Sequence, residues 1–251
     1  MSLYFSLFPS IEKVLAIKYN EQKTTGIKQM SGHYLKNQYP AVERAGVLSY
    51  GGNQTWSENP VIRKCGCGVI GSLDLLLYLG RYHCAAPWLP TEGPVAQKEY
   101  DRLCAALSRK YFPLLPPFGT NGVALACGLN GIFRKTHMPF HASWRISEKR
   151  LFGTVESMLD KDIPAVISIG ANFPLVWQRE GVTLYTKDRS GAMRKAASAR
   201  AHYVTVTVSD DEWLRISSWG REYYMNKAEY KRYIEKHSSS IISNVLYVER
   251  T

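Results

Sequence analysis

The sequence predicts an α+β fold, because helical and strand-like patterns occupy different parts of the chain. Apolar residues recur with a spacing of three and four between 67 and 160, whereas short β-branched or alternating runs dominate from 163 to 248. Helices followed by an antiparallel sheet are typical of α+β proteins, with a cleft between the halves. We expect one domain over 1–251, comprising an N-terminal segment of unclear role (1–50), a helical half (51–160) and a β-rich half (161–251).

Leucines crowd every face of the run Val69 to Leu79, which predicts a buried central helix. Helical spacing predicts three further helices, at 97–111, 123–135 and 148–159. Strands are expected at 139–144, 165–169, 202–208, 213–217 and 241–248. The densest basic stretch, 186–201, also contains glycine, serine and alanine, and we interpret it as a solvated loop.

Composition narrows the class of protein. With 45% hydrophobic and 21% charged residues among 251, the chain has the composition of a soluble globular protein. The net charge of +11 is dispersed and no nucleic-acid-binding motif accompanies it, so we do not expect nucleic acid as a partner. No run of eighteen apolar residues and no signal peptide is found, so no membrane association is expected. The sequence leaves the oligomeric state open.

Five cysteines without regular spacing argue against a disulfide framework and favour a reducing compartment, so a cytoplasmic location is expected. Cys65 and Cys67 lack the second cysteine pair that a structural zinc site needs, and His137 and His141 flank a proline, so no metal site is predicted.

Cys67 is the leading candidate for chemistry. It lies in a glycine turn at the start of the apolar helix, where backbone N–H groups lack intrahelical partners and the helix dipole is positive. That position predicts a lowered thiol pKa. The alternative is a cysteine that only packs, since free cysteines are often buried.

His202 opens the strand-like run to Val208, and the next predicted strand ends in polar residues around Ser217. A cysteine, a histidine and a polar orienting residue together form the nucleophile, base and orienter of thiol catalysis.

With these motifs, the chain resembles the papain-like cysteine peptidases, most closely the bacterial leader-processing (double-glycine, bacteriocin-type) branch. The resemblance covers about 52–224 and rests on short motifs: Cys67-Gly68-Val69 opening the apolar helix, the strand 162–169, His202-Tyr203-Val204-Thr205-Val206, and Ser217-Ser218-Trp219-Gly220, which is similar to an Asn-Ser-Trp-Gly segment. It implies a papain-like fold, with a central cysteine-bearing helix packed against an antiparallel sheet.

The resemblance implies roles for matching residues. Cys67 matches the nucleophile, and Cys65, which is followed by Gly66-Cys67, is the weaker candidate. His202 matches the base. Ser217 takes the place of the orienting asparagine or aspartate, a departure, because a hydroxyl carries no charge to stabilise an imidazolium. Asp210 and Asp211 are alternatives to Ser217, although acidic residues at a strand end more often form a turn.

The family also implies a glutamine that donates to the oxyanion. Gln54 is the candidate, although it lies thirteen positions before Cys67, and Asn59 is the fallback. Asn172 and Phe173 in the loop after the 165–169 strand, together with Trp219, are expected to contact substrate. Asp74, inside the apolar helix, is expected to have a structural role and a buried partner.

These residues predict a papain-like cysteine hydrolase, a peptidase or amidase that forms a thioester with a peptide or amide substrate and needs no cofactor. Whether water or an amine resolves the thioester is left open. Two alternatives stay open: a catalytically impaired papain-like peptide-binding module, and a basic nucleic-acid-binding protein.

Overall fold

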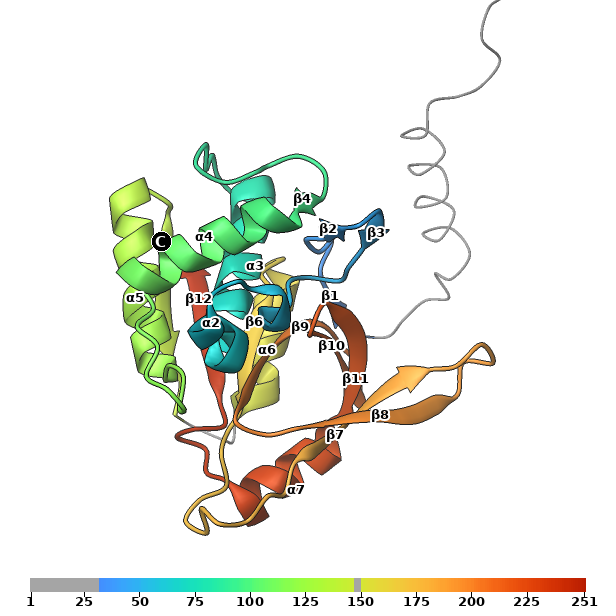
Figure 1. Ribbon diagram of the computed structural model, residues 1–251. Coiled ribbons are helices and arrows are strands. Elements are labelled where there is room, and N and C mark those ends of the chain that lie inside the picture. Colours follow the sequence, from blue (N-terminus) through green and yellow to red (C-terminus); the bar gives the residue numbers. More distant parts are fainter. Residues whose placement is uncertain (1–31, 147–149) are drawn as a thin grey trace, which may run out of the picture. The chain divides into compact units, whose positions relative to one another are not determined.

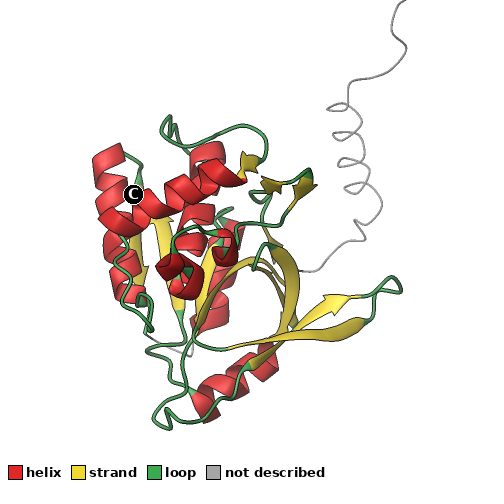
Figure 2. Ribbon diagram, viewed as in Figure 1, coloured by secondary structure: helices red, strands yellow, loops and turns green. Residues whose placement is uncertain are grey.

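The computed structural model describes residues 32–146 and 150–251 (Figure 1). It is a mixed fold of helices and mainly antiparallel sheet, which confirms the predicted α+β class (Figure 2). The compact unit that contains the described residues runs from Gly32 to Thr251. The part of the predicted single domain at 1–31 lies outside the described residues.

A nine-stranded antiparallel sheet is the centre of this unit. Its order is β5 (Phe140–Trp144), β12 (Val245–Arg250), β6 (Ala165–Ile169), β9 (His202–Ser209), β10 (Trp213–Ser218), β11 (Arg221–Asn226), β7 (Val182–Lys187) and β8 (Met193–Ala199), with β1 (His33–Tyr34) paired to β9. A small second sheet contains β3 (Val47–Leu48), β2 (Val42–Arg44) and β4 (Val95–Ala96).

Helices cover both faces of the central strands. All five residues of β6 are buried, and alternate residues of a strand point to opposite faces, so both faces need cover. One cover is α3 (Cys67–Tyr82), whose Gly71 approaches Val166 and Thr205, and the other is α6 (Leu151–Asp160). The remaining helices are α2 (Pro60–Cys65), α4 (Gln97–Lys110), α5 (Gly122–Thr136) and α7 (Lys227–His237), with a 3-10 turn, η1 (Gln54–Trp56).

The burial of α3 on all sides follows from its sequence. Every residue from Gly68 to Gly80 is buried, as the leucine-rich pattern predicts for a helix surrounded by other elements. Its contacts with β9 are the most extensive it makes with the sheet, so the first turn of α3 lies next to the strand that His202 opens.

Three predicted elements need correction. The basic stretch 186–201 is not a loop: Met193–Ala199 is β8, which pairs with β7 in a projecting hairpin, because its small residues allow a twisted edge strand (Figure 1). The last strand begins at Val245 rather than 241, since Ser239 closes a turn with Ile242 and Ser243. Helix α6 begins at Leu151, and 147–149 lie outside the described residues. Strand β11 and helix α7 were not predicted.

No helix in 32–146 or 150–251 has the length and apolar character needed to cross a bilayer.

Candidate active site

Cys67 occupies the first position of α3, directly after a break between two helices. Helix α2 ends at Cys65, and Gly66 follows with its N–H donating to the Ile62 carbonyl at 2.7 Å. A Cβ on Gly66 would lie 2.5 Å from that carbonyl oxygen, so the break requires glycine. Cys67 is therefore half-buried at a helix N-terminus, while Cys65 is buried and its thiol donates to the Val61 carbonyl at 3.1 Å.

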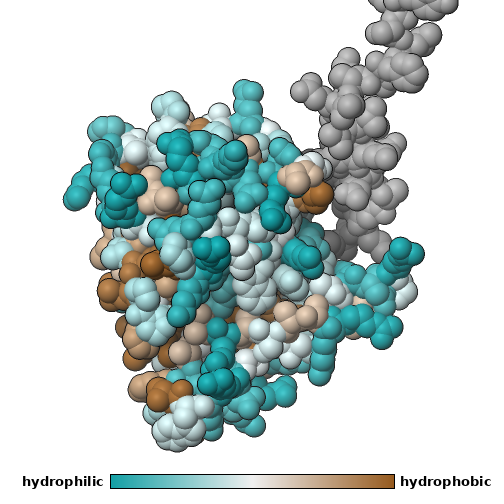
Figure 3. Space-filling view, viewed as in Figure 1, coloured by the Kyte–Doolittle hydropathy of each residue, from teal (hydrophilic) through white to brown (hydrophobic). Residues whose placement is uncertain are grey.

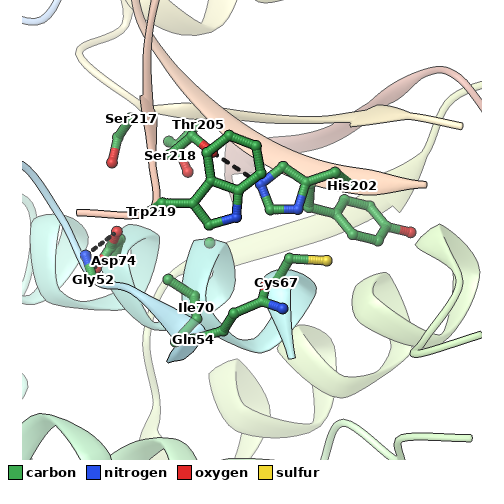
Figure 4. Close-up of a pocket in the computed structure, with 12 residues that line it drawn as sticks. Gly52, Gln54, Cys67, Ile70, Asp74, His202, Thr205, Ser217, Ser218 and Trp219 are labelled. Atoms are coloured by element: carbon green, nitrogen blue, oxygen red, sulfur yellow. Dashed lines mark hydrogen bonds between the residues drawn. The ribbon is translucent and has the colours of Figure 1, made fainter. Parts of the chain in front are cut away.

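His202 lines the same pocket as Cys67 (Figure 4). It is 8% exposed, and its ring stacks on Trp219 with centroids 4.5 Å apart and an interplanar angle of 19°. Its Nε2 lies 2.9 Å from the Ser218 hydroxyl, which leaves Nδ1 on the side of Cys67. The ring is thus held by one stacking contact and one hydrogen bond.

The structure corrects the predicted orienting residue from Ser217 to Ser218. The Ser217 hydroxyl donates to the Tyr50 carbonyl at 2.7 Å and does not meet the imidazole. Successive residues of a strand point to opposite faces, so a shift of one position exchanges the two serines. Asp210, the alternative, accepts from the N–H groups of Glu212 and Trp213 in the turn between β9 and β10, as expected of an acidic residue at a strand end.

Gln54 reaches the site despite its distance along the chain. It opens η1, lines the pocket, and extends its side chain toward Cys67 (Figure 4). Its Nε2 donates to the carbonyls of Arg63 and Lys64 at 3.2 and 3.3 Å, so the short helix α2 folds the intervening residues back onto it. Asn59, the fallback, caps α2 instead by accepting from Val61 and Ile62 N–H groups.

Asp74 anchors the loop that carries Gln54. Its carboxylate accepts from the Gly52 N–H at 3.0 and 3.2 Å, from the Tyr100 hydroxyl at 2.7 Å and from the Tyr39 hydroxyl at 3.1 Å. The expected buried partner of Asp74 is therefore confirmed as backbone and tyrosine donors. Burial raises the pKa of Asp74 to about 6, against these hydrogen bonds, which lower it.

The pKa of Cys67 differs from the sequence prediction. Burial raises the pKa of the Cys67 thiol, and the backbone N–H groups of Tyr203 and Gly68 offset this only in part. Burial also lowers the pKa of His202 to about 4. The lowered thiol pKa predicted from the helix N-terminus is therefore wrong in direction, because desolvation outweighs the dipole. At neutral pH the resting pair is a thiol and a neutral imidazole.

The three predicted substrate contacts separate in the structure. Trp219 lines the pocket and covers His202. Asn172 is buried, with Nδ2 donating to the carbonyls of Glu180 and His237, so it packs the loop after β6 rather than facing the pocket. Phe173 is half exposed on that loop, and its contact with substrate stays a prediction.

Sequence reasoning missed Ser218 and Thr205, which also line the pocket. The only signal for Ser218 was its position beside Ser217 in a strand whose register the sequence does not reveal. All five cysteines lie within the described residues and none is disulfide-bonded. Among the described residues, no group of three or more His, Cys, Asp or Glu side chains is placed to hold a metal ion.

Comparison of the chain with protein-family models, with curated proteins and with solved structures found no match.

Proposed function

We propose that this protein is a papain-like cysteine hydrolase that cleaves peptide or amide bonds through a thioester. The observation that carries the proposal is the sharing of one pocket by Cys67 and His202, with His202 Nε2 bonded to Ser218. A thiol at a helix N-terminus, a base and a residue that orients the base are the parts that thiol catalysis requires.

The reaction follows from this arrangement. As Cys67 Sγ attacks the carbonyl carbon, its proton passes to His202 Nδ1, while Nε2–H remains bonded to the Ser218 hydroxyl. The oxyanion is stabilised by the Cys67 N–H in the unpaired first turn of α3. Gln54, whose Nε2 donates to the Arg63 and Lys64 carbonyls in this structure, must turn its amide away from them to add a second donor. The C–N bond then breaks, the amine leaves with the proton from His202, and water hydrolyses the thioester. Because the resting pair is neutral, the proton moves during attack.

Exposed apolar side chains near the site favour a peptide over a small amide. Thr120 lies next to Gly68, and its carbonyl accepts from the Tyr203 hydroxyl. The loop that leads to Thr120 exposes Leu115 and Phe118, the latter at 89%. Figure 3 shows apolar patches on the side that carries α5 and its preceding loop.

A second apolar loop, after β6, is tied to the residue before His202 by a hydrogen bond from the Ala201 N–H to the Gly170 carbonyl, at 3.3 Å. This loop exposes Phe173, Val176 and Trp177. Clusters of exposed apolar residues mark interaction sites, so the favoured substrate is a peptide with apolar side chains flanking the scissile bond.

The test is turnover of quenched fluorogenic peptides with apolar residues on both sides of the cleavable bond, in the wild type, Cys67→Ala and Cys65→Ala. Turnover should vanish in Cys67→Ala and persist in Cys65→Ala, because the buried Cys65 thiol donates to the Val61 carbonyl and does not line the pocket. Equal turnover in the wild type and Cys67→Ala would refute the proposal.

A second candidate is a peptide-binding module without full activity, which the raised Cys67 pKa and the uncharged Ser218 favour. It predicts peptide binding by fluorescence anisotropy that is the same in wild type and Cys67→Ala, without cleavage in either.

A further inference from the structure

The hairpin of β7 and β8 projects from the body of the fold, and β8 is the last strand at one side of the large sheet (Figure 1). One side of β8 pairs with β7, and within 32–146 and 150–251 no strand pairs with its other side. The uncovered edge of a strand presents backbone N–H and C=O groups that can bond another strand. The outer edge of β8 is therefore an open surface, and the chemistry around it decides what it can bind.

The register of the hairpin shows which backbone groups of β8 face outward. The Asp188 N–H donates to the Ala192 carbonyl at 2.9 Å, and the pairing continues in the same register as far as Lys195. Hydrogen-bonded and non-hydrogen-bonded pairs alternate in an antiparallel ladder. The N–H and C=O groups of Met193 and Lys195 therefore point away from β7, and the two sets lie about 7 Å apart, the two-residue repeat of a strand.

The side chains around this edge are strongly cationic. The stretch 187–200 contains one carboxylate, Asp188, and five cations, which are Lys187, Arg189, Arg194, Lys195 and Arg200. Asp188 pairs with Arg194 at 2.9 Å, whereas the exposed Arg189 and Lys195 have no carboxylate partner among the described residues. The hairpin therefore presents an excess of positive charge beside its free edge.

The adjoining elements do not cancel this charge. Glu222 of β11 accepts from the Tyr224 hydroxyl at 2.7 Å and lies 3.5 Å from the Arg215 guanidinium. Helix α7, which packs against β7, has four lysine and arginine side chains and two glutamates, one of which accepts from the Tyr185 hydroxyl. Figure 3 shows the projecting hairpin as a hydrophilic surface. Its edge is therefore suited to a charged partner.

The positive charge discriminates between possible strands at this edge. A second copy of β8 would bring the Arg194 and Lys195 side chains against like charges, so the edge disfavours pairing with another copy of this chain. An acidic strand would instead place its carboxylates beside these cations. The cations that discourage self-association therefore favour an acidic peptide.

The backbone of the edge favours a peptide over a nucleic acid. Outward N–H groups of β8 alternate with outward C=O groups, so a complete ladder needs a partner that both donates and accepts. A peptide backbone does both, and added strands of this kind are a common mode of peptide recognition. A phosphate backbone only accepts, so it would be held by the lysines and arginines alone.

Strand β8 also leads directly to the candidate active site. It ends at Ala199, and His202 follows three positions later, a span of at most about 11 Å. The connection is tied to the loop after β6 by the hydrogen bond from the Ala201 N–H to the Gly170 carbonyl. A peptide that lies along β8 is therefore directed toward the pocket that contains Cys67.

We infer that the outer edge of β8 binds an acidic peptide segment, which adds to the large sheet as a further strand. Backbone hydrogen bonds at Met193 and Lys195 hold the segment, and the cations of the hairpin bind its carboxylates. The role of this segment as part of a substrate rests on the proposed function, whereas the binding itself does not. The segment then anchors a substrate at a distance from the scissile bond.

The experiment measures fluorescence anisotropy at low salt with labelled peptides of about twelve residues, long enough to cover β8. One peptide alternates glutamate with threonine, and its matched control has glutamine in place of glutamate. The protein is the full chain with Cys67→Ala, so that no peptide is cleaved. The glutamate peptide should bind and the glutamine peptide should bind at least fivefold more weakly. Equal affinity for the two peptides would overturn the inference.

A charge reversal locates the binding on the hairpin. In the Cys67→Ala background, Lys195→Glu should weaken binding of the glutamate peptide about fivefold, because an attraction is replaced by a repulsion. The matched control is Lys98→Glu, the same change at an exposed position of α4, and it should leave the affinity unchanged. Equal affinities of these two variants would show that the peptide binds elsewhere.

A proline tests the backbone part of the interaction. Met193→Pro removes an outward N–H without changing any charge, and edge strands tolerate proline where the N–H faces outward. It should weaken binding of the glutamate peptide about fivefold through the loss of one hydrogen bond, whereas Met193→Ala should not. Unchanged binding by folded Met193→Pro would mean that charge alone holds the peptide, and strand addition would be rejected.

Should Met193→Pro unfold the hairpin, a modified peptide decides the same point. A glutamate peptide that is N-methylated at all its central residues keeps its charges but has no central N–H donors for either edge. It should bind the unaltered hairpin at least fivefold more weakly than the parent peptide. Equal binding of the two peptides would reject strand addition.

Two results would assign the edge to another occupant. A single-stranded oligonucleotide that binds more tightly than the glutamate peptide, and binds Met193→Pro equally well, would make the hairpin a nucleic-acid-binding surface. A dimer in sedimentation velocity that Met193→Pro dissociates would make the edge an interface between copies of this chain. Either result would contradict the inference.

Because Cys67→Ala cannot form a thioester, failure of the binding and failure of the proposed hydrolase are separate results. Binding to β8 without turnover in the wild type would retain this inference and reject the hydrolase. Turnover of apolar peptides without affinity for the glutamate peptide would do the reverse.

Discussion

The middle and the C-terminal end of α3 hold polar clusters that differ in their distance from the candidate site. At the C-terminal end, Asp162 accepts from the Lys36 N–H and the Asn37 amide, each at 2.7 Å, and from the Tyr78 hydroxyl, and lies 3.5 Å from His83 Nε2. In the middle of the helix, Asp74 accepts from the Gly52 N–H and from the Tyr39 and Tyr100 hydroxyls, and it lines the pocket that contains Cys67 and His202. The Asp162 cluster fixes the end of the helix, whereas the Asp74 cluster fixes the loop that lines the pocket of Cys67 and His202.

The comparison also separates two buried or half-buried histidines. His83 Nε2 lies 2.7 Å from the Asp162 carbonyl, and this contact ties the end of α3 to the turn after α6. His202 bonds a hydroxyl and keeps a second nitrogen toward a thiol. Position relative to Cys67, rather than burial, distinguishes the two imidazoles.

The largest expected effect contrasts these histidines. His202→Ala should reduce kcat/KM on a fluorogenic peptide by about 10³-fold, because the general base is lost. His83→Ala should change kcat/KM less than twofold while lowering the free energy of unfolding by about 1–2 kcal/mol. Steady-state kinetics measures kcat/KM, and urea unfolding measures the free energy of unfolding. Similar losses of turnover in both variants would erase the distinction between the two histidines.

The next effect is on stability. Asp162→Ala should lower the free energy of unfolding by about 3 kcal/mol, because it leaves the buried Tyr78 hydroxyl and the Lys36 N–H without their acceptor. Chemical denaturation measures it, and turnover per folded molecule should be retained. A loss below about 0.5 kcal/mol would show that the cluster is not a structural anchor.

A third prediction uses the pH dependence of stability. The raised pKa of Asp74 means that its contribution to stability is present below its unfolded value near 4 and is lost as pH rises through about 6. The lowered pKa of His202 acts oppositely, so its contribution is lost as pH falls from 6.5 through about 4. In the wild type, these two contributions to the pH dependence of stability oppose each other.

Asp74→Asn removes only the first contribution. Its free energy of unfolding should therefore rise more steeply between pH 4 and 6 than that of the wild type, by on the order of 2 kcal/mol. Urea unfolding at several pH values measures the slopes. Parallel slopes would mean that Asp74 does not titrate in this range.

The smallest effect concerns the exposed apolar loop after β6. Trp177→Ala should raise KM for an apolar peptide about threefold with little change in kcat, since its side chain is 73% exposed and does not line the pocket of Cys67 and His202. Val47→Ala, an exposed apolar change in β3, is the control and should leave KM unchanged. An unchanged KM in Trp177→Ala would remove this loop from the proposed substrate surface.

Much of the fold followed from local pattern. The buried helix at Cys67 and the strands at Ala165 and His202 have strong periodicity, and the structure has them within a few residues of the predicted bounds. Residues 193–199 were predicted as part of a loop but form strand β8, because alanine, serine and lysine have no strong strand propensity. They pair because β7 lies beside them.

The sequence by itself determined the α+β class, the glycine break before Cys67, and the candidate pairing of Cys67 with His202, because these depend on residue type and short spacing. Only the tertiary structure decided that Ser218 rather than Ser217 meets the imidazole, that the pKa of Cys67 rises, and that Asp74 lines the same pocket as His202. Strand register and burial arise from contacts between distant segments, so no local pattern encodes them.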